Sequence, residues 1–80
     1  MDDDLRTIAD IIRALFDEYE GPVTRDLSAR DVAQWDSLAN VQFVVLVERA
    51  FAIRFATREI GGFKNIAELL DLVAAKRTQQ

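Results

Sequence analysis

The sequence has neither cysteine nor histidine among its 80 residues. Disulfides need cysteine, and structural zinc sites are built mainly from cysteine and histidine, so neither kind of cross-link can stabilise the fold. The same absences exclude thiolate nucleophiles, imidazole bases and the pairs that these groups form with serine. We therefore expect a protein that is not an enzyme, that holds no metal, and whose core depends on apolar packing alone.

A long apolar run and an excess of basic residues are also missing. No stretch approaches the roughly 20 apolar residues of a membrane-spanning helix. The net charge of −4 repels the phosphates of nucleic acids and of anionic lipids. The start of the chain, Met1-Asp2-Asp3-Asp4, is acidic where a secretory signal is basic. These features predict a cytoplasmic protein without a nucleic-acid or membrane partner.

The sequence does contain apolar residues at helical spacing, and hydrophobic residues make up 50% of the chain. From Asp4 to Tyr19 they recur at steps of three and four, which predicts an amphipathic helix that Gly21-Pro22 ends. Residues 21–34 lack such spacing and form a long connection, in which 28–31 can make a short turn. The residues expected to anchor the helix are Leu5, Ile8, Ile12, Leu15, Phe16 and Tyr19, and those expected to anchor the connection are Val23, Leu27 and Val32.

A second helix is predicted from Ser37 to Phe51, because Asp36 and Ser37 are both good helix caps. It carries two apolar stripes, one for the core and one left partly exposed, as on a surface that binds a partner. A strand over 41–47 is the alternative, since this segment is rich in β-branched residues, but no turn follows that could pair it. The core stripe consists of Phe43, Val44, Val47 and Phe51, and the exposed stripe of Leu38, Val41 and Val45.

The last third of the chain predicts one short and one long helix. Thr57 can cap a single turn through Ile60, which Gly61-Gly62 stops. Residues 65–68 resemble a capping box that opens the long helix. The residues expected on its buried face are Ile66, Leu69, Leu70 and Val73.

These elements predict an all-α fold, a small four-helix bundle with three main helices, one short helix and a long first loop. Residues 1–80 are expected to form a single domain, because single cores are typically built from about 50 to 200 residues and no linker interrupts the chain. We expect this domain to be a monomer.

Ser37 has two interpretations. As a cap residue, with Asp36, it satisfies backbone N–H groups at the start of the second helix. An exposed hydroxyl at this position is also a suitable point for attaching a phosphate, because the unpaired N–H groups and the positive end of the helix dipole stabilise negative charge. Spacing alone favours the cap.

The chain resembles the acyl carrier protein family over nearly its whole length. The matching features are Asp36-Ser37-Leu38 at the start of the second helix, the run from Val41 that ends in Glu48-Arg49-Ala50-Phe51, and Phe63-Lys64-Asn65-Ile66 at the start of the last helix. By this resemblance Ser37 would carry a 4'-phosphopantetheine arm, whose thiol holds acyl groups as thioesters. A phosphopantetheinyl transferase that uses coenzyme A and magnesium would attach the arm, and Asp36 would help to present the serine.

The resemblance also implies a surface on which the arm or a partner rests. Besides Asp36, Ser37 and Leu38, this surface would comprise Trp35, Val41, Gln42, Val45, Glu48, Ile60 and Phe63. The partners would be enzymes that load and transfer acyl groups. In the fatty-acid members of the family the second helix is strongly acidic, whereas this chain has Ala39, Asn40, Gln42 and Arg49, and only Glu48 keeps the charge. Because charge complementarity governs partner choice, we expect a dedicated carrier of a specialised fatty-acid or polyketide-type pathway.

Two other functions stay open, and so does the role of Trp35. The protein could be an aminoacyl or peptidyl carrier, although such carriers usually have glycine-rich residues where this chain has Gln34-Trp35-Asp36. It could also be an interaction module that binds a partner helix through its exposed stripe, without modification of Ser37. Trp35 is either part of the carrier surface or a cover that closes the loop over the core.

Overall fold

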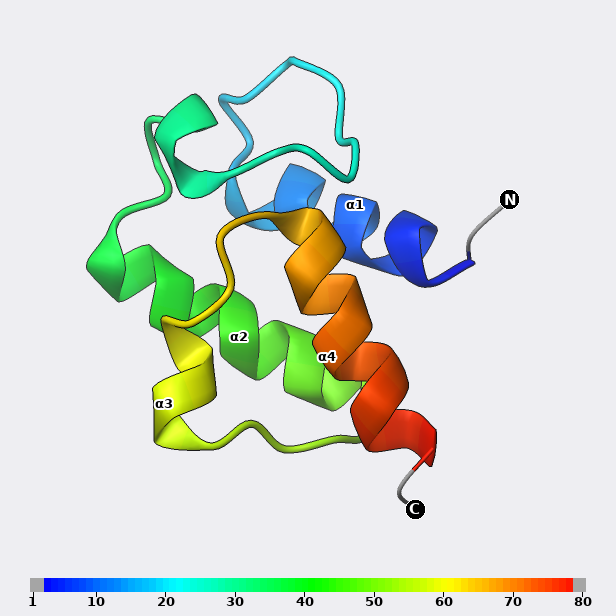
Figure 1. Ribbon diagram of the computed structural model, residues 1–80. Coiled ribbons are helices and arrows are strands. Elements are labelled where there is room, and N and C mark those ends of the chain that lie inside the picture. The colour runs from blue at the N-terminus through cyan, green and yellow to red at the C-terminus, as the bar shows by residue number, and fades with distance from the viewer. Residues whose placement is uncertain (1–2, 79–80) are drawn as a thin grey trace.

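The computed structural model describes residues 3–78, which fold into helices joined by loops, without a strand (Figure 1). In chain order these helices are α1 (Asp3–Leu15), the 3-10 turn η1 (Ala29–Asp31), α2 (Ser37–Phe51), α3 (Thr57–Ile60) and α4 (Ile66–Thr78). The predicted all-α fold is confirmed, and the alternative strand over 41–47 is wrong. Within the described range, each helix falls short of the length and apolar character needed to cross a bilayer. Met1 and Asp2, on which part of the expected location rested, lie outside the described residues.

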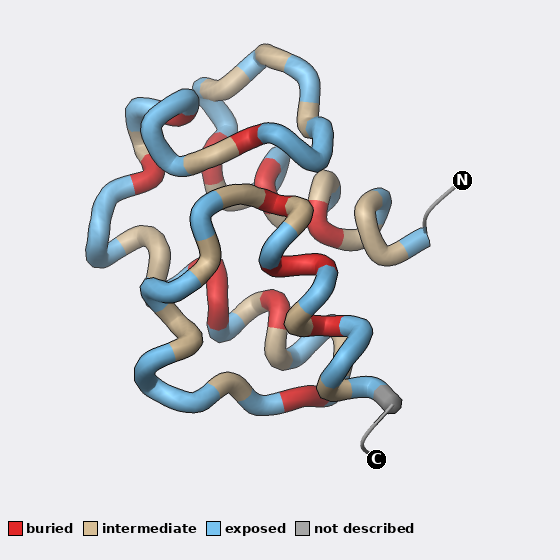
Figure 2. Tube along the Cα trace, viewed as in Figure 1, coloured by how far each residue is buried: buried red, intermediate tan, exposed pale blue. Residues whose placement is uncertain are grey.

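The core lies where α1, α2 and α4 meet, and Figure 2 shows their buried positions in the middle of the molecule. Full burial of one large apolar side chain typically stabilises a fold by about 1.5 to 3 kcal/mol, so the buried side chains are the main attraction between the three helices. The side chains without any exposed surface follow the predicted helical spacing, and they are Ile8, Ile12, Phe43, Val47, Ile66, Leu69 and Val73.

The first helix is shorter than predicted, since it ends at Leu15 and not at Tyr19. Beyond it the chain makes a turn in which the Tyr19 N–H donates to the Phe16 carbonyl at 3.0 Å. The Tyr19 hydroxyl donates to the Pro22 carbonyl at 2.7 Å, so this residue fastens the loop and does not extend the helix. The early turn leaves Phe16 free to stack its ring on that of Trp35, with 5.3 Å between the ring centroids.

The long first loop joins α1 to α2 and is anchored as predicted. Its anchors are the buried Leu27 and Val32 and the half-buried Val23. The predicted short turn is present as η1. The loop also caps α4, because the carbonyls of Arg25 and Leu27 accept hydrogen bonds from Ala67 and Ile66 at 2.9 and 3.0 Å. The first N–H groups of a helix have no partner within it, so the loop completes the N-terminal end of α4.

Helix α2 begins and ends at the predicted residues. Asp36 is its N-cap, since the Oδ1 atom of this residue accepts a hydrogen bond from the Ala39 N–H at 2.8 Å. At the other end Ala52 takes the left-handed conformation, with φ of 56°, and its N–H donates to the Glu48 carbonyl. This geometry is a common way of ending a helix, although it favours glycine over alanine.

The predicted core stripe of α2 needs one correction. Phe43, Val44 and Val47 are buried, but Phe51 is only half-buried. The Arg77 guanidinium lies 5.7 Å from the centre of the Phe51 ring and pairs with the Asp4 carboxylate at 2.6 Å. Phe51 therefore lies at the edge of the core, under a charged side chain of α4.

The short helix α3 is capped differently from the prediction. Its N-cap is Ala56 and not Thr57, and the missing side-chain acceptor is replaced by the Glu59 carboxylate, which accepts from the Ala56 N–H at 2.7 Å. The predicted glycine stop is present. A Cβ atom at Gly62 would lie 2.9 Å from the Arg58 carbonyl oxygen, so only glycine fits where the chain turns back so closely.

The start of α4 agrees with the prediction except for one hydrogen bond. The Asn65 side chain accepts from the Glu68 N–H at 3.0 Å, as in a capping box. The Glu68 carboxylate accepts from the Lys64 N–H at 2.8 Å, one residue earlier than the box requires. The buried face comprises the predicted Ile66, Leu69, Leu70 and Val73.

Candidate functional site

Ser37 is the first residue of α2, and it is exposed. In Figure 1 this end of α2 lies at the left of the molecule, on the side opposite both chain ends. Because Asp36 provides the cap, the position of Ser37 does not depend on a capping role for its own hydroxyl. A phosphate at such an exposed helix start is typically stabilised by about 0.3 to 1 kcal/mol.

A groove of about 400 Å³ opens directly beside Ser37, and we call it the Ser37 groove. Its walls come from η1, the loop before α2, the first turn of α2, and the segment from the end of α3 into α4. Its volume falls in the range of small-molecule sites, roughly 300 to 1,000 Å³. The residues that line it include Trp35, Asn40, Ile60, Phe63 and Lys64.

Asn40 links two walls of the Ser37 groove. Its Oδ1 atom accepts a hydrogen bond from the Trp35 Nε1–H at 2.9 Å, and its Nδ2 atom donates to the Ile60 carbonyl at 2.9 Å. An indole N–H can only donate and a carbonyl can only accept, so the two partners determine which way the amide points. This pair of hydrogen bonds, the Asn40 clip, ties α2 to the loop before it and to the end of α3.

Aromatic rings form the layer beneath the groove. The Trp35 ring packs on those of Phe16 and Phe43, with centroid distances of 5.3 and 5.0 Å, and Phe43 lies 6.5 Å from Phe63. Trp35 is only 6% exposed, so it covers the core, while its remaining surface lines the groove. Each such ring pair typically adds about 0.5 to 1.5 kcal/mol beyond the effect of burial.

The exposed apolar stripe predicted on α2 is present. The exposed fractions are 73% for Leu38, 49% for Val41 and 38% for Val45. Gln42 is exposed beside them. None of these four side chains lines the Ser37 groove. They form a separate face of the same helix.

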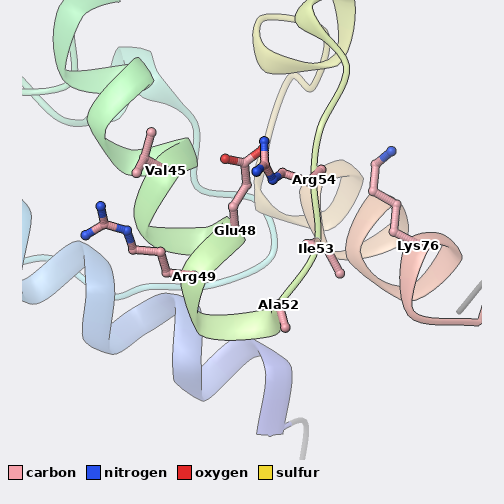
Figure 3. Close-up of a pocket in the computed structure, with 7 residues that line it drawn as sticks. All are labelled: Val45, Glu48, Arg49, Ala52, Ile53, Arg54 and Lys76. Carbon is pink, nitrogen blue, oxygen red and sulfur yellow. The ribbon is translucent and has the colours of Figure 1, made fainter.

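A second hollow, of about 610 Å³, lies at the other end of α2 (Figure 3). Figure 3 shows Glu48 and Arg54 pointing toward one another between α2 and the loop that follows it, with Arg49 on the opposite side of the helix. The Glu48 carboxylate accepts a hydrogen bond from the Phe55 N–H at 2.7 Å. The carboxylate expected to face a partner is therefore used to hold the chain's own backbone.

Lys76 of α4 also lines this second hollow and pairs with α3. Its Nζ atom lies 2.8 Å from the Glu59 carboxylate and 5.7 Å from the centre of the Phe55 ring. The hydrogen bond from Lys76, followed by that from the Ala56 N–H, lowers the pKa of the Glu59 carboxyl from its ordinary value of 4.5.

The structure divides the predicted site residues among three places. The Ser37 groove gathers Trp35, Asp36, Ser37, Ile60 and Phe63. The exposed face of α2 carries Leu38, Val41, Gln42 and Val45, and the second hollow is lined by Glu48 and also by Val45. Sequence reasoning missed Asn40, Ser28, Lys64 and Asn65 as groove residues. Asn40 and Gln42, the two amides in the first half of a largely apolar helix, were the available signal, since buried polar groups are nearly always hydrogen-bonded.

Comparisons of the chain with protein-family models, with curated proteins and with solved structures found no match. The resemblance to acyl carrier proteins therefore depends on the sequence motifs around Ser37, from Val41 to Phe51 and at the start of α4. Function has to be inferred from these motifs and from the geometry of the site.

Proposed function

We propose that the protein is a carrier that holds acyl groups as thioesters on a 4'-phosphopantetheine arm attached to Ser37. The observation that carries this proposal is the exposed Ser37 at the first residue of a 15-residue helix, directly beside a groove of about 400 Å³. An enzyme can reach the hydroxyl, and the start of α2 stabilises the charge of a phosphodiester. The groove offers the attached arm a place to lie.

The attachment reaction needs no catalytic residue from this chain. The Ser37 oxygen forms a bond to the phosphorus that carries the pantetheine of coenzyme A, and the adenosine bisphosphate leaves. A phosphopantetheinyl transferase supplies the base and the magnesium ion. Asp36 acts indirectly, because its hydrogen bond to the Ala39 N–H sets the direction of the first turn and so the position of Ser37.

The exposed face of α2 suits a dedicated set of partner enzymes. It offers them the apolar Leu38, Val41 and Val45, and the single carboxylate of the helix, that of Glu48, is hydrogen-bonded to the backbone of Phe55. Partners that recognise an acidic helix would gain little from this face. We assign the carrier to a specialised fatty-acid or polyketide-type pathway in the cytoplasm, as a monomer.

The test is an intact-mass measurement after incubation with coenzyme A and a promiscuous phosphopantetheinyl transferase. We expect one added arm on the wild-type protein and none on Ser37→Ala. Ser28→Ala is the matched control, because Ser28 is the other serine of the chain and lines the same groove. This control should take up the arm like the wild type.

An unchanged mass of the wild-type protein would reject the proposal. The exposed stripe on α2 would then favour the interaction module, which uses Leu38, Val41 and Val45 without modification of Ser37. If the arm is attached, the aminoacyl or peptidyl carrier is separated from the acyl carrier by the activating enzyme that loads the thiol.

A further inference from the structure

The Ser37 groove and the core are separated by a closed layer. Phe43 has no exposed surface, and its ring packs against those of Trp35 and Phe63, which line the groove from the other side. The Asn40 clip spans this layer and binds Trp35 on one side and Ile60 on the other. A chain that moved from the groove toward the core would have to break the clip or separate the rings.

Opening this layer is costly for two independent reasons. Breaking the Asn40 clip leaves the Trp35 N–H and the Ile60 carbonyl without their partners at part-buried positions. Separating the rings gives up close-packed contacts that an incoming alkyl chain could replace only in part. The groove itself, in contrast, is open beside Ser37 and has Asn40, Lys64 and Asn65 in its lining.

We propose that the Asn40 clip keeps the interior closed to cargo, so that this carrier holds short or polar acyl groups at its surface and not long alkyl chains in its core. The inference rests on the proposed attachment of an arm to Ser37. Burial in a protein core stabilises a long alkyl chain, because its apolar surface is unfavourable in water. A carrier whose core is closed cannot provide this stabilisation. Acetyl groups and acyl groups that carry hydroxyl or carbonyl oxygens have no such need.

The first measurement uses the whole protein loaded with acetyl-, hexanoyl- or decanoyl-pantetheine from the corresponding coenzyme A thioesters. Intact mass confirms that each arm is in place, and thermal unfolding then compares the three forms. We expect equal melting temperatures. A rise of about 4 °C or more on going from acetyl to decanoyl, the shift that roughly 1 kcal/mol produces in a domain of this size, would overturn the inference.

The second measurement locates the cargo by NMR. The protein has one tryptophan, so its single indole N–H signal reports directly on the Asn40 clip. We expect decanoyl loading to shift signals of Ile60 and Lys64 in the groove, to keep the indole N–H signal in its hydrogen-bonded form, and to leave the signals of Ile12 and Leu69 in place. Shifts at Ile12 and Leu69 would show that the alkyl chain enters the core.

A variant tests the clip itself. In Asn40→Ala the route is open, so decanoyl loading should raise the melting temperature of this variant and not that of the wild type. Gln42→Ala is the matched control, because it removes an exposed amide from the same helix without touching the clip. If Asn40→Ala responds like the wild type, the clip does not close the interior and its assigned role is wrong.

The inference and the proposed function fail in different ways. Without attachment at Ser37 no arm appears in the mass spectrum, and the carrier proposal falls before any cargo is loaded. With the arm attached, a wild-type core that takes up decanoyl overturns the inference alone. The wild-type measurements decide this even if Asn40→Ala does not fold.

Discussion

The two ends of α2 carry hollows of opposite character. At the start of the helix, the Ser37 groove is closed beneath by rings and by a pair of hydrogen bonds between uncharged groups. At the other end, the hollow is lined by three cationic side chains and one carboxylate, which belong to Arg49, Arg54, Lys76 and Glu48. The Ser37 groove thus has one acidic and one basic residue in its lining, Asp36 and Lys64, whereas the second hollow is mainly cationic.

The direction of the helix explains part of this difference. Backbone N–H groups and the positive end of the dipole favour a bound anion at Ser37, whereas the negative end favours cations such as Arg49 in the last turn. Exposed ion pairs contribute little in water, while the clip at the first end satisfies part-buried groups. This difference is consistent with the proposed attachment of the arm at the first end and not at the second.

The largest expected effect comes from the two phenylalanines of α2. Phe43→Ala should lower the free energy of unfolding by about 3 to 5 kcal/mol, because it empties a fully buried position under the groove. Phe51→Ala should cost only about 1 to 2 kcal/mol, since this ring is half-buried and loses less contact. Denaturant unfolding of both variants gives the two values. Equal losses would show that the two ends of α2 are packed alike.

A smaller loss of stability is expected when polar contacts at the two ends of α2 are removed. Asn40→Ala leaves the Trp35 N–H and the Ile60 carbonyl unpaired and should cost about 1 to 3 kcal/mol. Glu48→Gln keeps an oxygen that can accept from the Phe55 N–H, so its cost should stay below about 1 kcal/mol. Thermal unfolding separates these values, because 1 kcal/mol shifts the melting temperature of such a domain by about 4 to 8 °C. A larger loss for Glu48→Gln would reverse the comparison.

The smallest effect is the pH dependence at the second hollow. Contacts with Lys76 and the Ala56 N–H lower the pKa of Glu59 below 4.5, so the unfolded chain binds a proton at this residue more readily than the folded one. The stabilisation is therefore fully present above pH 4.5 and is lost as the pH falls through the lowered folded-state value. Glu59→Gln should flatten this part of the stability profile, measured by unfolding at a series of pH values. Parallel profiles for the two proteins would contradict the assignment.

The helices were predictable where one local signal was strong. The cap residue Asp36 and the apolar spacing from Phe43 to Val47 placed α2 correctly, and the exposed fractions of Leu38, Val41 and Val45 agree with the second stripe. The end of α1 was not predictable in the same way. Tyr19 continues the apolar spacing, but its hydroxyl finds a partner in the Pro22 carbonyl, a contact between neighbouring loop residues that periodicity does not report.

The site was predictable in part. The residues that gather at the Ser37 groove come from four segments of the chain. Two of them, Ile60 and Phe63, were expected there only because of the family resemblance. From the sequence, Asn40 is only a neutral residue at a position where fatty-acid carriers are acidic. Its role in the site is not predictable, because the fold brings its two partners, Trp35 and the Ile60 carbonyl, to it. Glu48 was expected on the surface, although its carboxylate turns to the backbone of Phe55.

By itself the sequence determined the class of fold, the bounds of α2 and the serine at its start, because capping and helical spacing act between neighbours a few residues apart. Only the tertiary structure decided which side chains surround that serine. The Asn40 clip contains a hydrogen bond between residues 20 positions apart, and the rings beneath the groove come from α2 and from three loop segments. Such contacts depend on how the whole chain packs, and no local pattern encodes them.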